Sequence, residues 1–112
     1  MEVKQGEVVL CQFYFSDAKQ AKNRPVMVYK DNLPFDDFIG IPISSKSIQH
    51  SDELPINNRE FLLGSLPKPS KLIIRKTFVI SKQVVLKRYG QVNPQKMDEI
   101  FHAFCNYFEC RQ

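Results

Sequence analysis

Short apolar runs separated by polar loops fill the chain as far as residue 92. The first run, Glu7–Phe15, follows Gly6 and is rich in β-branched and aromatic residues, a composition that favours a strand. Alternate side chains of a strand point to the same side of the sheet. One face of this strand would therefore hold Val9, Cys11, Phe13 and Phe15.

Five more strands are predicted in the same way, at 24–30, 37–45, 53–56, 71–80 and 86–92. Gly40 and Pro42 indicate a bend in the third strand. The short run 53–56 would be an edge strand, and the run 71–80 could be broken near Lys76. Polar segments at 16–23 and 57–70 are expected to be loops, with one helical turn at 81–85.

The last part of the chain predicts an amphipathic helix. Asn93 is a good N-cap, and Pro94 suits the first helical position. Apolar side chains then recur with helical spacing at Met97, Ile100, Phe101, Phe104, Cys105 and Phe108. We expect this stripe to close the core of the domain rather than to bind a partner.

Strands that follow one another without intervening helices favour an antiparallel sheet over βαβ units. The sequence therefore predicts a single domain, 1–112, of the mainly β (α+β) class. Its architecture would be a small, SH3-like curled barrel of five to six strands with the helix at its C-terminus. A length of 112 residues leaves room for one core and a shallow site.

Composition and charge narrow the function classes. No apolar run is long enough to span a bilayer, and the polar start MEVKQGE is unlike a signal peptide, so we expect a cytoplasmic protein without a membrane partner. No cofactor is expected, because the chain has only 4 glycines and no glycine-rich phosphate loop. The formal net charge is +4, and the stretch 68–88 holds seven basic residues and no acid. That stretch is either a polyanion-binding surface or simply a solvated basic face.

The three cysteines, Cys11, Cys105 and Cys110, predict neither a disulfide framework nor a zinc site. Their number is odd, and they lack the four-ligand spacing that zinc needs. Cys11 and Cys105 each lie in an apolar pattern, so both are expected to be buried thiols.

Two local patterns could carry chemistry. Arg24 precedes Pro25 at a loop–strand junction, where a guanidinium on rigid backbone could bind a phosphate with two hydrogen bonds. Ser44 and Ser45 end the third predicted strand, where hydroxyls could donate to a phosphoryl oxygen. Of the two histidines, His102 flanks the helix stripe and His50 lies in a polar loop.

Together these patterns resemble the MazF/PemK family of toxins from bacterial toxin–antitoxin pairs. The matching segments, in chain order, are Gly6–Val9 (GEVV), Phe15–Asp17 (FSD), Lys22–Val28 (KNRPVMV), Ile41–Ser45 (IPISS), Lys68–Arg75 (KPSKLIIR) and Gly90–Asn93 (GQVN). The loop before Arg24 departs from the family in lacking its usual glycines, which could change sequence preference or activity.

The resemblance implies a homodimeric, metal-independent endoribonuclease that cuts single-stranded RNA and is bound by a cognate antitoxin. Carried over by motif, the catalytic residues would be Arg24 and Ser44. The expected substrate-binding residues are Ser16, Asp17, Lys22, Ser45, Lys46, Arg75 and Lys76. The general base stays open, with His50 as a candidate. The alternative is a non-catalytic barrel that docks a protein or nucleic acid, because the same barrel occurs in toxins that poison gyrase.

Overall fold

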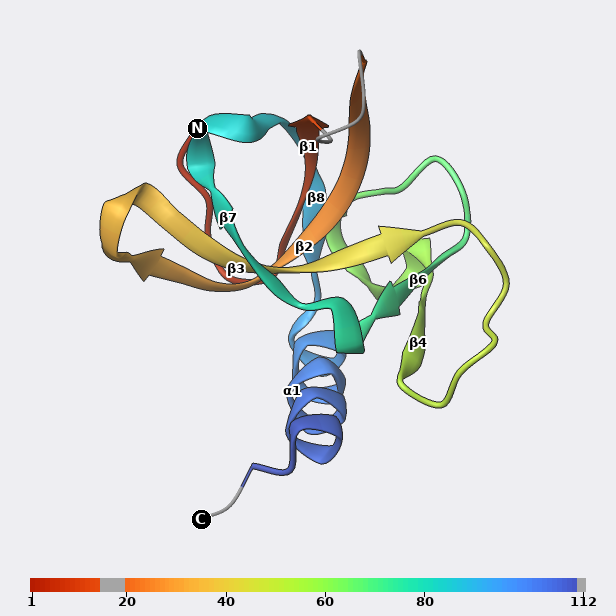
Figure 1. The fold of residues 1–112 in the computed structure, drawn as a ribbon. Helices are drawn as coiled ribbons and strands as arrows, with labels where there is room; N and C mark the ends of the chain where they lie inside the picture. Colours follow the sequence, from red (N-terminus) through yellow and green to blue (C-terminus); the bar gives the residue numbers. More distant parts are fainter. Residues whose placement is uncertain (15–19, 111–112) are drawn as a thin grey trace.

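The structure is a computed structural model that describes residues 1–14 and 20–110 (Figure 1). Eight strands, four short 3-10 helices and one α-helix are present in these residues. The strands are β1 Glu7–Tyr14, β2 Ala21–Leu33, β3 Asp37–Ser44, β4 Glu53–Ile56, β5 Phe61–Gly64, β6 Ser70–Ile73, β7 Phe78–Ser81 and β8 Val85–Val92, and helix α1 is Pro94–Phe108.

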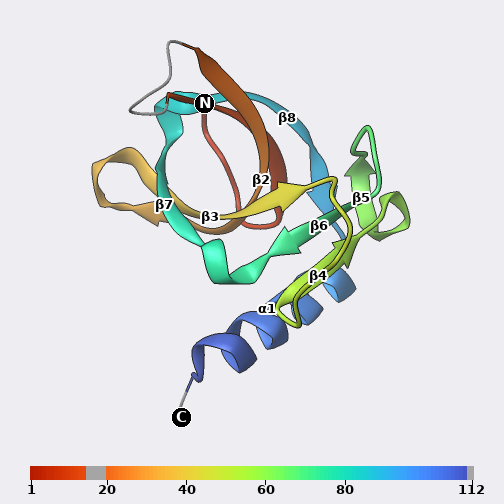
Figure 2. The same ribbon diagram turned by 45° about the vertical axis from the view of Figure 1, so that its right-hand side comes forward.

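The strands form one antiparallel sheet that curls into a barrel. Neighbours follow the order β4-β6-β3-β2-β1-β8-β5, while β7 pairs with the first half of β3 beside β6. Figure 2 shows the sheet curling round on itself, with α1 lying outside the ring of strands. The predicted class, a small curled antiparallel barrel with a C-terminal helix, is confirmed.

The number of strands is larger than predicted. The run at 71–80 is two strands, β6 and β7, separated by the 3-10 turn Ile74–Lys76, where a break was expected. The segment 57–70, predicted to be a loop, contains β5, and β2 begins at Ala21, inside the other predicted loop. The predicted edge strand at 53–56 and the helical turn near 81–85 are confirmed by β4 and the 3-10 helix Lys82–Val84.

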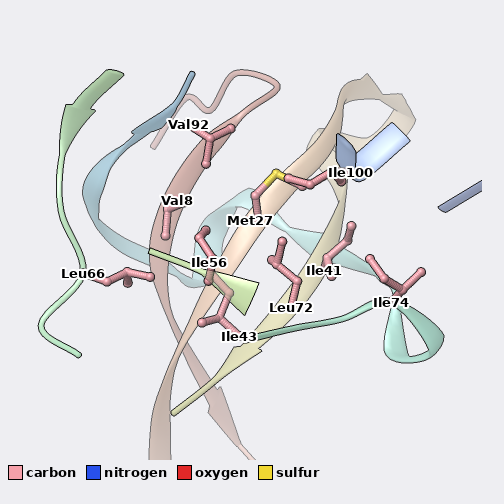
Figure 3. Packing of buried hydrophobic residues seen from close by; sticks show 10 residues of the cluster. All are labelled: Val8, Met27, Ile41, Ile43, Ile56, Leu66, Leu72, Ile74, Val92 and Ile100. Atoms are coloured by element: carbon pink, nitrogen blue, oxygen red, sulfur yellow. The ribbon is translucent and has the colours of Figure 1, made fainter. Parts of the chain in front are cut away.

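The three central strands bury side chains on both faces. The larger core cluster is shown in Figure 3 and comprises Val8, Met27, Ile41, Ile43, Ile56, Leu66, Leu72, Ile74, Val92 and Ile100. The second cluster lies on the opposite face and comprises Val3, Val9, Cys11, Val26, Val28, Phe38, Ile80 and Val85. Two-sided burial explains why the buried parts of β1, β2 and β3 have consecutive apolar residues rather than an alternating pattern.

Helix α1 begins as predicted, because the Asn93 side chain accepts a hydrogen bond from the Lys96 N–H at 2.7 Å. Ile100 is fully buried in the larger cluster, and Met97 and Phe104 pack against that cluster half-buried. Burial then fades as the helix leaves the barrel (Figure 1), so Phe108 is exposed. No helix of the described residues is long and apolar enough to cross a membrane.

The cysteine prediction is right for one residue and wrong for another. Cys11 is buried, and burial raises its pKa to about 12, which makes it a poor nucleophile. Cys105 is exposed, because it lies on the part of α1 that extends past the barrel. The helical spacing placed it correctly on the stripe, but spacing does not say how far the barrel reaches along the helix.

Candidate functional site

An open pocket of about 930 Å³ lies where β2 and β3 meet β6 and the loop 45–50. Both predicted catalytic residues, Arg24 and Ser44, line it. They come from β2 and β3, which are neighbouring strands of one sheet.

Arg24 lies in β2, paired with Cys11 of β1 and followed by Pro25. Its side chain is exposed, and its guanidinium makes no ion pair or hydrogen bond with the residues that the structure describes. A fixed strand therefore holds a positive group that faces the pocket without an acidic partner in the described ranges, as an anion site requires.

Ser44 is the last residue of β3, where it pairs with Lys71 of β6. The ladder between β2 and β3 ends at the pair Val26 and Pro42, and Arg24 and Ser44 each lie two residues beyond that pair on their own strand. The Ser44 Oγ accepts a hydrogen bond from the Lys46 N–H at 3.2 Å. This bond uses the oxygen as acceptor, so the hydroxyl proton remains available to donate.

A buried carboxylate in the pocket wall holds the neighbouring loop. Glu53 Oε1 accepts hydrogen bonds from the Lys71 ammonium at 2.7 Å and from the backbone N–H groups of Gln49 and His50 at 2.8 and 3.2 Å. The second oxygen accepts from the Arg75 guanidinium at 2.9 Å. The hydrogen bond from Lys71, followed by the one from Gln49, holds the pKa of Glu53 well below its usual range. Glu53 therefore stays ionised and ties the loop that carries His50 to β6.

Four of the seven basic residues in the stretch 68–88 are ion-paired with acids from other parts of the chain. Lys71 and Arg75 pair with Glu53, Lys82 with Glu2, and Arg88 with Glu7. The stretch is consequently not one free basic face. Lys68 and Lys76 are exposed, line the pocket and form no ion pair within the described part of the chain.

Six of the nine predicted site residues are brought together in the pocket: Arg24, Ser44, Ser45, Lys46, Arg75 and Lys76. Of these six residues, Arg75 has a guanidinium that already forms ion pairs, with both Asp52 and Glu53. Lys22 lies farther along β2, opposite Phe13, and does not line the pocket. Ser16 and Asp17 lie outside the described residues.

Aromatic side chains in the pocket were missed by the sequence interpretation. Phe13, Tyr14, Phe78 and Tyr89 all line it, and the rings of Phe13 and Phe78 are 5.7 Å apart. The Lys87 ammonium lies 5.0 Å from the Tyr89 ring centroid. Aromatic rings among cations are the combination that binds the bases and phosphates of a single strand. The available signal was that Phe13 and Phe15 share one face of the first predicted strand.

No three His, Cys, Asp or Glu side chains gather as a possible metal site in residues 1–14 and 20–110. Within the described residues, the pocket offers an arginine without an acidic partner, a serine hydroxyl from the neighbouring strand, aromatic rings and three lysines that form no ion pair, Lys46, Lys68 and Lys76. The fold and site thus define a small β-barrel protein with a pocket suited to an extended anion. This description is more specific than the fold alone would allow, because the basic and aromatic side chains of the pocket lie on one surface.

The barrel is similar to solved toxin structures. A mycobacterial endoribonuclease in complex with its cognate antitoxin matches with a TM-score of 0.72 and 14% identity, covering 99% of both chains. The Mycobacterium tuberculosis toxin MazF-mt6 matches at 0.72 and 18%, covering 95% of this chain and 99% of that one. A MazE–MazF structure from Deinococcus radiodurans matches at 0.79 and 10%, covering 97% and 98%. At these identities the likeness establishes the fold.

A family model assigns the sequence itself. The model of PemK-like, MazF-like toxins of type II toxin–antitoxin systems matches residues 4–108. The chain belongs to this toxin family, as its motifs had indicated. No curated protein sequence matches the chain at a significant level.

Proposed function

We propose that the chain is an endoribonuclease toxin that cuts single-stranded RNA without a metal ion, with Arg24 and Ser44 as its catalytic residues. One observation carries the proposal. Arg24 of β2 and Ser44 of β3 line the same open pocket, and Arg24 has no acidic partner in the described ranges. Membership of the PemK/MazF toxin family supports the same activity.

In such a reaction the substrate supplies its own nucleophile. The ribose 2′-hydroxyl loses its proton and attacks the adjacent phosphorus, and the 5′-oxygen of the next nucleotide leaves with a proton. The products are a cyclic phosphate and a 5′-hydroxyl end. The phosphorane between them carries extra negative charge, so the enzyme's main task is electrostatic stabilisation. Arg24 meets that charge with two N–H donors, and Ser44 donates one hydrogen bond from the facing strand.

The remaining pocket residues would bind the RNA chain. Lys46 and Lys76 offer exposed ammonium groups for phosphates, and Ser45 offers a hydroxyl. The aromatic rings of the pocket offer faces on which unpaired bases can stack. Arg75 would act through its remaining donors, since one of its nitrogens is held by Asp52 and Glu53. Lys22, Ser16 and Asp17 would contact nucleotides farther along the strand.

The general base has one candidate in the pocket. Arginine stays protonated in proteins and cannot remove the 2′-proton. His50 lines the pocket, and its backbone is anchored to Glu53 at 3.2 Å. A neutral imidazole has one ring nitrogen that can accept a proton, so His50 is chemically suited to act as a base. We therefore assign charge stabilisation to Arg24 and offer His50 as the base.

The decisive experiment incubates purified protein with end-labelled single-stranded RNA in excess EDTA. The expected result is cleavage at short sequences, with products that carry cyclic phosphate and 5′-hydroxyl ends. Arg24→Ala is the essential comparison, and Arg59→Ala is its matched control, because Arg59 is exposed and lies outside the pocket. Intact RNA over a wide protein concentration range would reject the nuclease and favour the non-catalytic binding module.

The variants separate catalysis from binding. Arg24→Ala should lower turnover by on the order of a hundredfold or more while affinity changes little, because the lost donor acts in the transition state. Arg24→Lys should also fail, since a single ammonium cannot replace two parallel donors. Ser44→Thr should retain activity, and Ser44→Ala should lose part of it. If Arg24→Ala cuts at the parental rate, the catalytic group lies elsewhere, and His50→Ala is the next variant to test.

Toxins of this kind act in the cytoplasm as homodimers held by an antitoxin, and we propose the same for this chain. Five aromatic side chains are exposed in the described residues. They are Tyr14, Phe35, Phe78, Tyr107 and Phe108. A monomeric barrel of this size would be expected to expose less apolar surface. Sedimentation should show a dimer at micromolar concentration, and a purely monomeric profile would contradict this assembly.

A further inference from the structure

The C-terminal end of α1 brings two cysteines together by a backbone reversal. Glu109 caps the helix in the left-handed conformation, with φ 55° and ψ 50°. Its N–H and that of Cys110 both donate to the Cys105 carbonyl, the latter at 3.0 Å. A helix end of this type places the third residue from the end beside the second residue past it, usually as an apolar contact. Here those two positions are Cys105 and Cys110.

The two thiols are in contact and open to solvent. A hydrogen bond between them is the main cause of the raised pKa of Cys105. Both residues are exposed, whereas Cys11 is buried in the second core cluster. The pair lies beside Tyr29, whose ring stacks on Phe104 at 4.2 Å between centroids. The folded helix end therefore holds two accessible sulfurs together against a packed aromatic surface.

We propose that Cys105 and Cys110 form a dithiol site that reacts with a low-molecular-weight disulfide and closes into a reversible intrachain disulfide. This site is separate from the RNA pocket, and the inference does not depend on the proposed nuclease activity. No residue of the pair lines the pocket.

The chemistry proceeds in two exchanges. The thiolate of one cysteine attacks a sulfur of the small disulfide and releases one small thiol, which leaves a mixed disulfide on the protein. The second cysteine then attacks the protein sulfur of that mixed disulfide and releases the second small thiol. The protein loses two electrons and two protons, and the small disulfide gains both.

The test treats the native protein with oxidised glutathione, alkylates the remaining thiols and measures the tryptic peptide of residues 97–111. The expected peptide has lost two hydrogen atoms, carries no glutathione and is restored by dithiothreitol. Cys105→Ser and Cys110→Ser should each retain one glutathione on the remaining cysteine, because no neighbour can displace it. Two glutathione adducts on the native peptide, or no reaction, would overturn the proposal.

A second measurement tests whether the folded helix end matters. The equilibrium constant for closing the disulfide against glutathione should fall on the order of tenfold or more in concentrated urea, where the two thiols are no longer held together. An equal constant in both solvents would show that the cap contributes nothing. Phenylarsine oxide, which needs two neighbouring thiols, should block both cysteines in the native protein at one equivalent. Failure to block both would also count against the site.

Discussion

Ile100 is the apolar side chain through which α1 is inserted into the larger core cluster. It is fully buried, among Met27, Ile41 and Ile74 (Figure 3). Ile100→Ala removes three carbons, and at about 0.8 kcal/mol for each the transfer cost is roughly 2.4 kcal/mol. Residues of the surrounding strands are held by the ladder and cannot close the gap, so a cavity term raises the expected loss to about 3–4 kcal/mol.

The assay is urea unfolding followed by circular dichroism at one fixed protein concentration. The midpoint should fall with an unchanged slope, and Ile100→Val should lose only about 1 kcal/mol. His102→Ala is the matched control, because His102 lies on the exposed side of the same helix and should change stability by less than about 0.5 kcal/mol. A loss below about 1 kcal/mol for Ile100→Ala would refute the view that α1 closes the core through this residue.

Three further predictions concern the pocket and the sheet. The pKa of Glu53 is lowered in the folded protein, so its stabilising effect is complete above pH 4.5 and is lost as the pH falls further. The urea midpoint of E53Q should therefore change less with pH in the acidic range than the urea midpoint of the parent. Gly64→Ala, with a Cβ 2.0 Å from the Tyr89 carbonyl, should lower the melting temperature more than Gly6→Ala, whose nearest neighbour is at 3.7 Å. Lys76→Ala should lower the slope of log affinity for RNA against log salt by about 0.7 if it contacts one phosphate. Equal pH profiles of E53Q and the parent would contradict the first prediction. Equal melting temperatures of the two glycine variants would contradict the second, and an unchanged salt slope for Lys76→Ala would contradict the third.

The sequence alone was sufficient to predict the elements that are determined by residues next to one another in the chain. The Asn93–Pro94 start of the helix and the edge strand β4 follow from residues next to one another, and both are confirmed. Strand β5 could not be found in this way. It is held by β8, where the backbone of Gly64 comes so close to Tyr89 and Gly90 that a side chain would not fit. Such a pairing depends on residues far apart in the chain.

The candidate site likewise has features that local sequence predicts and features that depend on residues far apart in the chain. Motifs located Arg24 and Ser44, and the pairing of β2 with β3 brings these two positions, twenty residues apart in the sequence, to one pocket. The pairing of Lys71 with Glu53 could not be predicted, because it depends on β4 and β6 being neighbours. For the same reason, the sequence of the stretch 68–88 suggested more unpaired basic side chains than the fold contains, because acids from other parts of the chain pair with several of them.

The hairpin of β2 and β3 also determines where chain length can vary over evolution. Arg24 and Ser44 both line the pocket while the register through Val26 and Pro42 is kept, and a one-residue deletion inside the ladder would turn one of the two side chains to the opposite face. The hairpin tip at Pro34–Asp36 lies beyond two register shifts, and Phe35 there is 94% exposed. Insertions and deletions among relatives should therefore accumulate at this tip, while the number of residues between the ladder and each of the two proposed catalytic positions should stay constant.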